Sequence, residues 1–176
     1  AAGKYADTDG SSTCSACPPG SAQHVEGSVG CNSCPPGTHA GNDLHCVSCL
    51  PGTYAGAGDP NVECVPCPKG RFTAATKASE CSSCAAGSFA TGGATACTKC
   101  AAGQEQPVQG ENFCMDCKVG RYTTVAGTAA CSMAGPGYYV PGLGASAQVQ
   151  CNAGTYSPGQ GSNECTTCAV GSVNPK

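Results

Sequence analysis

The sequence lacks tryptophan altogether, and its 176 residues include only three phenylalanines, six tyrosines and two methionines. Large apolar side chains supply most of the buried surface of an ordinary domain, so their scarcity argues against a single large core. No apolar run approaches the roughly 20 residues of a membrane-spanning helix, and no heptad pattern indicates a coiled coil. The net charge of −3 and eight scattered Lys and Arg residues offer no basic surface for nucleic acid.

Residue patterns for catalysis are also missing. The three histidines, His24, His39 and His45, fall in predicted loops without a nucleophile and acid pattern beside them, so we expect solvated side chains. Segment 7–10 (Asp-Thr-Asp-Gly) resembles the start of a calcium loop, but the twelfth position, which requires glutamate, is Pro18. We interpret this segment as a hairpin turn, and we expect no enzyme, no cofactor and no metal site.

Asn-x-Ser/Thr, the acceptor sequence for N-linked glycans, does not occur. Only the rare Asn-x-Cys form is present, at Asn32, Asn112 and Asn163. Serine and threonine are abundant in the predicted loops and permit O-linked glycans. Glycans therefore stay among the expected partners, without an assigned residue.

Cysteine is in excess, with 18 residues beside 26 glycines and 13 prolines. This fraction is typical of a disulfide scaffold, which forms in an oxidising compartment, so we predict a secreted or extracellular cell-surface protein. Cys-x-x-Cys pairs also occur in zinc sites, but seven consecutive pairs, several followed by Pro-Gly turns, favour disulfides. Ala1 falls inside the repeat pattern, so we expect a mature or partial chain without a signal peptide.

Cysteine pairs recur along the whole chain. Their first members lie at Cys14, Cys31, Cys46, Cys64, Cys81, Cys97, Cys114, Cys131 and Cys165. The steps as far as Cys131 are 15 to 18 residues, and the remaining 34 residues equal two steps of 17, with the absent first cysteine at Gln148. A period near 17 indicates small stacked units. We predict one array over residues 1–176, with repeats that begin near residues 1, 14, 31, 46, 64, 81, 97, 114, 131, 148 and 165.

A glycine lies three residues after each second cysteine position, and we call these the register glycines: Gly3, Gly20, Gly37, Gly52, Gly70, Gly87, Gly103, Gly120, Gly137, Gly154 and Gly171. In segment 50–53 (Leu-Pro-Gly-Thr), proline presets φ for the second turn position and glycine accepts the positive φ of the third, as a type II turn requires. Thr53 and Tyr54 are strand formers, and 55–61 is rich in turn formers. We therefore predict an all-β, small disulfide-rich fold, an elongated tandem array of about ten short β-hairpins. An aromatic residue two positions after many of the glycines should supply part of each unit's buried surface.

The cysteine pairing can be argued from a defect. Two of the twenty slots between Cys14 and Cys168 are empty: Ala134, a second position, and Gln148, the next first position. If each second cysteine bonds the first cysteine of the following pair, these two slots are partners. One whole disulfide is then absent, and no cysteine is left unpaired by its loss. Extra apolar residues at 138–143 then replace the lost cross-link. This interleaved scheme leaves Cys14 and Cys168 open and predicts Cys17–Cys31, Cys34–Cys46, Cys49–Cys64, Cys67–Cys81, Cys84–Cys97, Cys100–Cys114, Cys117–Cys131 and Cys151–Cys165.

Two other pairings stay open. In the first, each Cys-x-x-Cys pair closes on itself and Cys131 bonds Cys151. Such short loops are typical of redox-active motifs and would not cross-link hairpins. In the second, first cysteines bond first cysteines and second bond second in blocks of two, which leaves Cys117 and Cys165 without partners. We predict the interleaved scheme.

Segments 31–38 (CNSCPPGT), 46–54 (CVSCLPGTY) and 81–89 (CSSCAAGSF) resemble the ephrin-receptor-like cysteine-rich repeat. The resemblance extends over essentially the whole chain. Long tandem arrays of such repeats are similar to protist surface proteins, such as ciliate immobilisation antigens and algal flagellar-hair-like proteins. It implies an extracellular repeat fold but no single function, because the module occurs in receptors, adhesins and coats.

We expect an extracellular structural protein, a subunit of a surface filament, hair or coat that self-associates into a polymer or layer. The alternative is the ectodomain stalk of a receptor or adhesin that binds a protein ligand. Cys14 and Cys168 are candidate intersubunit cysteines, because Cys168 starts a loop that Lys176 ends early and Cys14 should close a loop that starts before Ala1. The tail of one subunit then carries what the head of the next lacks, which favours head-to-tail assembly. Further repeats outside this sequence are the other explanation of both open cysteines.

Overall fold

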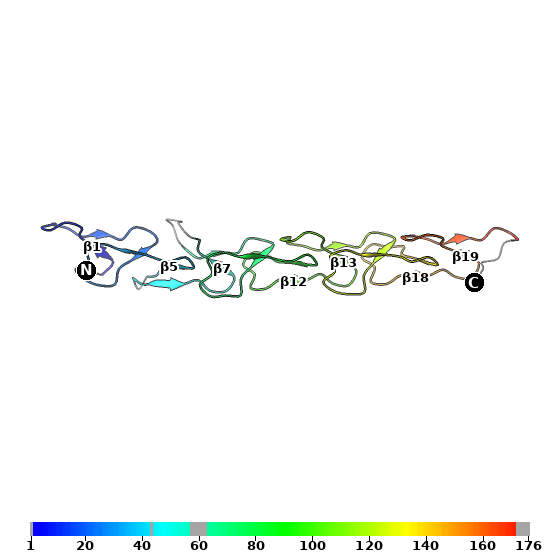
Figure 1. Cartoon of the computed structure of the whole chain (residues 1–176), viewed down its shortest axis with the longest axis horizontal. Helices are drawn as coiled ribbons and strands as arrows, with labels where there is room; N and C mark the ends of the chain where they lie inside the picture. The colour runs from blue at the N-terminus through cyan, green and yellow to red at the C-terminus, as the bar shows by residue number, and fades with distance from the viewer. Residues whose placement is uncertain (1, 43, 57–62, 172–176) are drawn as a thin grey trace. The chain divides into compact units, whose positions relative to one another are not determined.

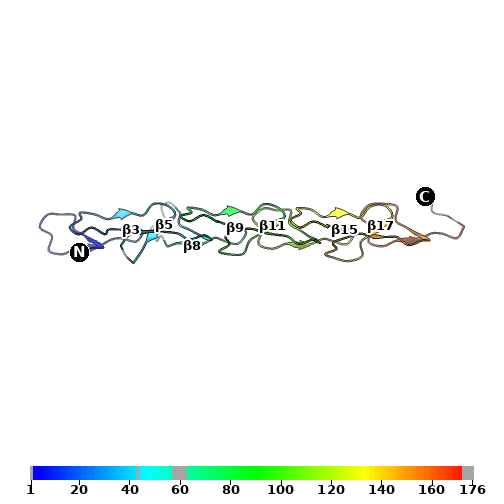
Figure 2. The same cartoon turned by 90° about the horizontal axis from the view of Figure 1, so that it is seen from below.

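The fold consists of short hairpins and connecting loops. A computed structural model describes residues 2–42, 44–56 and 63–171, and this part of the chain contains no helix and therefore none that could cross a membrane. The chain divides into two compact units, one of residues 1–82 and 91–96, the other of residues 83–90 and 97–176. Figures 1 and 2 show the strands and loops in two perpendicular views.

Twenty strands are assigned in the described residues, and consecutive strands pair into ten two-stranded sheets (Figure 1). The first ten are β1 (Lys4–Tyr5), β2 (Ser15–Ala16), β3 (Ser21–Ala22), β4 (Asn32–Ser33), β5 (Thr38–Ala40), β6 (Cys46–Ser48), β7 (Thr53–Tyr54), β8 (Val65–Pro66), β9 (Arg71–Phe72) and β10 (Ser82–Ser83). The others are β11 (Ser88–Phe89), β12 (Thr98–Lys99), β13 (Gln104–Glu105), β14 (Met115–Asp116), β15 (Arg121–Tyr122), β16 (Ser132–Met133), β17 (Tyr138–Tyr139), β18 (Val149–Gln150), β19 (Thr155–Tyr156) and β20 (Thr166–Thr167). The predicted all-β fold of ten hairpins is confirmed.

Each hairpin starts with the predicted turn. In segment 50–53 the Thr53 amide donates to the Leu50 carbonyl at 3.0 Å, and Gly52 has a φ of 81°. All eleven register glycines have φ values between 76° and 85°, a left-handed conformation that favours glycine. The turn delivers the two following residues to the first strand, and the two residues between the cysteine positions form the second strand. In β17–β18, for example, Tyr139 lies opposite Val149.

The core of each repeat is small. It is centred on the second cysteines, such as Cys100 and Cys117, and on the third residue after each register glycine, which we call the core position. Val140 occupies a core position and is fully buried. The aromatic residue one position earlier is only half-buried at Tyr139 and is exposed at Tyr156. Because neighbouring residues of an extended chain point to opposite sides, burial of the core position turns the aromatic ring outward.

Candidate functional site: the stacking surfaces of the repeats

Eight disulfides cross-link the hairpins: Cys17–Cys31, Cys34–Cys46, Cys49–Cys64, Cys67–Cys81, Cys84–Cys97, Cys100–Cys114, Cys117–Cys131 and Cys151–Cys165. These are the eight pairs of the interleaved scheme, and neither of the other pairings occurs. The Cα–Cα distances of 5.4 to 5.9 Å lie in the usual range for disulfides. Cys14 and Cys168 carry unpaired thiols.

The repeat without a disulfide replaces it with a hydrogen bond and with apolar packing. Gln148, at the position of the absent first cysteine, accepts a hydrogen bond through Oε1 from the Gly135 amide at 2.8 Å. The methyl group of Ala134 is fully buried, as the second cysteines Cys100 and Cys117 of the two preceding repeats are. Of the extra apolar residues expected to compensate, Val140 is buried, whereas Leu143 is 68% exposed. Ala134 and Gln148 therefore occupy the two positions that a disulfide joins in the other repeats.

Successive repeats are joined by main-chain hydrogen bonds. The Gly120 amide donates to the Val140 carbonyl, and the Val140 amide donates to the Ser162 carbonyl of the following repeat, both at 2.9 Å. The first of these bonds recurs at 2.7 to 2.9 Å in Gly37–Ala55, Gly52–Thr73, Gly87–Gln106, Gly103–Thr123 and Gly137–Ser157. Because both partners are backbone groups, the bonds persist although the side chains differ between repeats.

A third kind of hydrogen bond comes from a second series of residues, which we did not predict from the sequence. Each of these residues lies six or seven positions after a register glycine and has a left-handed φ of 60° to 83°. We call its members the left-handed loop residues: Gly10, Gly27, Leu44, Lys77, Gly93, Gly110, Gly127, Gly144 and Gly161. From Lys77 onward their amides donate to the carbonyl of the second cysteine position in the preceding repeat, as Gly161 does to Ala134 at 2.8 Å. The 17-residue spacing of the last four glycines is a signal that could have found them.

The two glycine series meet. A Cβ placed on Gly120 would lie 2.0 Å from the carbonyl oxygen of Gly161, two repeats further on. The same approach, at 2.1 to 2.4 Å, joins Gly37 to Lys77, Gly52 to Gly93, Gly87 to Gly127 and Gly103 to Gly144. Real Cβ atoms do not occur at such distances, so no side chain fits at these positions. The register glycines thus serve both the turn and the close contact between repeats.

Polar side chains at core positions fix the shape of the loops. Gln106 is 1% exposed; its Nε2 donates to the Phe113 carbonyl at 2.8 Å, and its Oε1 accepts from the Val108 amide at 3.0 Å. In the next repeat, Thr123 Oγ1 shares a hydrogen bond of 2.9 Å with Thr128 Oγ1. Buried polar groups need such partners, and at Gln106 and Thr123 these bonds fix the conformation of the loop that carries the left-handed residue.

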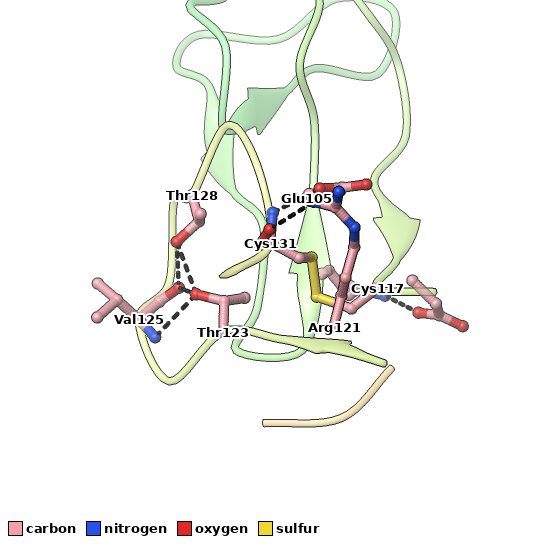
Figure 3. Close-up of a disulfide and its surroundings, with 9 residues drawn as sticks. Glu105, Cys117, Arg121, Thr123, Val125, Thr128 and Cys131 are labelled. Carbon is pink, nitrogen blue, oxygen red and sulfur yellow. Dashed lines mark hydrogen bonds between the residues drawn. A yellow bond between two sulfur atoms is a disulfide. The ribbon is translucent and has the colours of Figure 1, made fainter. Parts of the chain in front are cut away.

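Figure 3 shows this arrangement around Cys117–Cys131. Glu105 Oε2, from the preceding repeat, accepts a hydrogen bond from the Cys131 amide at 2.5 Å. Arg121 donates through a guanidinium nitrogen to the Cys131 carbonyl at 3.0 Å, and Arg71 makes the equivalent bond to Cys81 at 3.1 Å. Both backbone groups of Cys131 therefore have charged side chains as partners, which strengthens the bonds.

Two of the three histidines are in contact with each other. The rings of His24 and His45 are stacked, with centroids 4.4 Å apart. His39 lies in strand β5 and not, as the sequence had predicted, in a loop, and it lines an open hollow of about 440 Å³ together with Asn42 and Glu63. Within the described ranges, no group of three or more His, Cys, Asp or Glu side chains could hold a metal ion.

The stacking surface lies open at the last repeats. No described atom lies within 4 Å of a Cβ placed on Gly137 or Gly154, and Gly154 is exposed although most register glycines are buried. Gly137, Cys151, Gly154 and Tyr156 line a hollow of about 810 Å³. None of the described residues donates a hydrogen bond to the Cys151 carbonyl, whereas the equivalent Ala134 carbonyl accepts one from the loop of the following repeat.

The loops at Gly10 and Gly27 make no stacking contacts with the described residues. Gly10 and Gly27 have the left-handed backbone of the interior loop residues, with φ values of 79° and 71°. Their amides make no hydrogen bond to any described residue, and no described atom lies within 4 Å of a Cβ on either glycine.

The start of the chain is similar to a known protein family. Residues 3–43 match the family described as tyrosine-protein kinase ephrin type A/B receptor-like. No curated protein matches the chain. The matched region spans the first two complete hairpins, whose turns and second-strand positions are those of the later repeats. Together with the eight disulfides, it suggests an extracellular domain. The chain thus contains an ephrin-receptor-like cysteine-rich region at residues 3–43.

Proposed function

We propose that this chain is an extracellular structural protein, a subunit of a surface filament, hair or coat that self-associates by the stacking of repeats. The observation that carries the proposal is that backbone groups make the contacts between repeats. In the interior repeats, register glycines, core positions and left-handed loop residues form bonds or close contacts with other repeats. Chemistry that repeats from unit to unit suits an assembly of indefinite length.

The charge distribution supports the same function. Charged residues make up 11% of the chain, and the charged side chains of Glu105, Arg71 and Arg121 bond backbone groups of cysteines. These contacts rigidify the array. Solvent-exposed Ser and Thr residues in the strands, such as Ser83 and Thr166, are compatible with O-linked glycans on a surface layer.

Sedimentation velocity of the purified 176-residue chain over a range of concentrations tests the proposal. A structural subunit should form species larger than the monomer, and electron micrographs of the same samples should show filaments or sheets. A monomer at every concentration, with or without an oxidant, would contradict self-association.

The ectodomain stalk of a receptor or adhesin is the second candidate. It is favoured by the ephrin-receptor-like region at residues 3–43, because receptor ectodomains use such modules. A stalk stays monomeric in the sedimentation experiment, so the same measurement separates the two functions.

A further inference from the structure

We propose that residues 131–151 are an extensible segment, in which tension along the chain is opposed by noncovalent contacts and not by a cross-link. The inference goes beyond the proposed function, since a filament subunit and a receptor stalk would both carry tension along the same covalent path. It rests on the order of the eight disulfides and on the contacts of the repeat that lacks one.

Each disulfide shields a loop from tension. Because Cys117 bonds Cys131, a pull along the chain crosses from one Cα to the other over 5.8 Å and bypasses a peptide route of 14 residue steps. The other disulfides have Cα–Cα distances of 5.4 to 5.9 Å and act in the same way. From Cys17 to Cys131, successive disulfides are joined by links of three residue steps, as from Cys114 to Cys117. A loop behind an intact disulfide therefore adds nothing to the length of the chain.

Residues 131–151 break this pattern. The disulfide after Cys131 starts at Cys151, so tension crosses 20 residue steps without a shortcut. At about 3.5 Å per residue, this segment reaches about 70 Å when fully extended, whereas a link of three steps reaches about 10 Å. The segment is thus the longest stretch between Cys17 and Cys165 that can lengthen while every disulfide is intact.

Hydrogen bonds hold the segment in its folded form. Gln148 Oε1 accepts a bond from the Gly135 amide at 2.8 Å, where the other repeats have a disulfide. The Val140 amide donates to the Ser162 carbonyl, and the Val140 carbonyl accepts from the Gly120 amide, both at 2.9 Å. Each such bond contributes little compared with a covalent cross-link, and it re-forms without chemistry. Tension therefore opens this segment before it breaks a disulfide.

Apolar burial closes the segment again. Val140 is fully buried, and Tyr139 is half-buried opposite Val149 on the second strand of the hairpin. Extension transfers these side chains to water, which is unfavourable roughly in proportion to their apolar area. The segment therefore folds back when the tension falls, and its extension is reversible.

The test is single-molecule force spectroscopy of the intact 176-residue chain. DNA handles are attached to Cys14 and Cys168, whose thiols take part in no disulfide. The unaltered chain is compared with Ala134→Cys/Gln148→Cys, once mass spectrometry shows that this variant has formed its ninth disulfide. Ala134→Ser/Gln148→Ser is the matched control, because it alters the same two positions with side chains similar in size to cysteine and adds no cross-link.

The measured quantity is the extended length between the two handles. With eight disulfides intact, 44 residue steps and eight disulfide crossings join Cys14 to Cys168, which gives about 200 Å at full extension. We expect this length in the unaltered chain and in the serine control, and about 155 Å with the ninth disulfide. Relaxation should restore the starting length, and reduction of all disulfides should raise the extended length to about 540 Å.

Equal extended lengths in the unaltered chain and in the variant with nine disulfides would overturn the inference. A chain that does not shorten again after relaxation would overturn the reversible extension. Where the ninth disulfide fails to form, the unaltered chain decides alone: a length of about 200 Å supports the extensible segment, and a length of about 155 Å or less before reduction contradicts it.

Discussion

Replacement of Gly120 by alanine tests whether stacking, and not the turn alone, requires the register glycines. Gly120 has a φ of 77°, and a residue with a Cβ in this conformation costs about 1–2 kcal/mol. The new Cβ would also lie 2.0 Å from the Gly161 carbonyl oxygen, so the loop of the later repeat must move. That movement breaks the bonds from Gly161 to Ala134 and from Val140 to Ser162, each worth about 1 kcal/mol. The total loss should be about 3–4 kcal/mol.

Gly154→Ala is the matched control. Gly154 is the third residue of the same kind of turn and has a φ of 81°, but no described atom lies within 4 Å of a Cβ placed on it. This variant should lose only the conformational contribution of about 1–2 kcal/mol. The difference of about 2 kcal/mol between the two variants measures the stacking contact.

Hydrogen exchange of the Gly161 amide is the assay, because an array of repeats opens locally and need not unfold in two states. A difference of about 2 kcal/mol corresponds to exchange roughly 30-fold faster in Gly120→Ala than in Gly154→Ala. Equal exchange rates in the two variants would refute the reasoning, because the close approach of Gly120 to Gly161 would then contribute nothing.

Three further predictions concern the cross-links and the loops. Ala134→Cys combined with Gln148→Cys should form a ninth disulfide, seen as the loss of two hydrogen masses, and should stabilise the chain by about 3 kcal/mol; two free thiols in the folded variant would show that the sites do not face each other. Lys77→Gly should raise the free energy of unfolding by about 0.5–1 kcal/mol, because Lys77 is exposed with a left-handed φ of 60°, whereas Lys77→Ala should leave it unchanged; a lower denaturation midpoint in the glycine variant would count against strain at this loop. Reduction of the disulfides should abolish the circular dichroism of the folded chain, and a chelator should leave it intact; unfolding by the chelator alone would mean that a metal holds the repeats.

The hairpin and its cross-link could be predicted from the sequence because each depends on local chemistry. The register glycines mark turns through their φ values, and the paired defect at Ala134 and Gln148 points to the interleaved connectivity seen in Cys117–Cys131 and Cys151–Cys165. The replacement of the ninth disulfide by the Gln148–Gly135 hydrogen bond could not be predicted, since it depends on the reach of one side chain.

The stacking contacts were harder to predict because they join residues 18 to 41 positions apart. A glycine at position 120 is required both by the turn and by the close approach of the Gly161 carbonyl. The sequence shows the glycine but does not show which of the two requirements applies. The left-handed loop series was missed because Leu44 and Lys77 interrupt it. Aromatic residues such as Tyr139 were expected to supply part of the buried surface, yet the smaller Val140 is the fully buried residue, because stacking through backbone atoms leaves little room between repeats.

Small-angle X-ray scattering of the monomeric chain tests most directly whether the stacking within each unit continues through the whole array. Ten hairpins, each of which adds two strand spacings of about 4.8 Å, give a rod about 100 Å long with a radius of gyration near 29 Å. A compact globule of 176 residues would have a radius of gyration of about 16 Å. We predict the larger value and a scattering profile typical of a rod. A radius near 16 Å would contradict the stacked array and, with it, the structural function built on it.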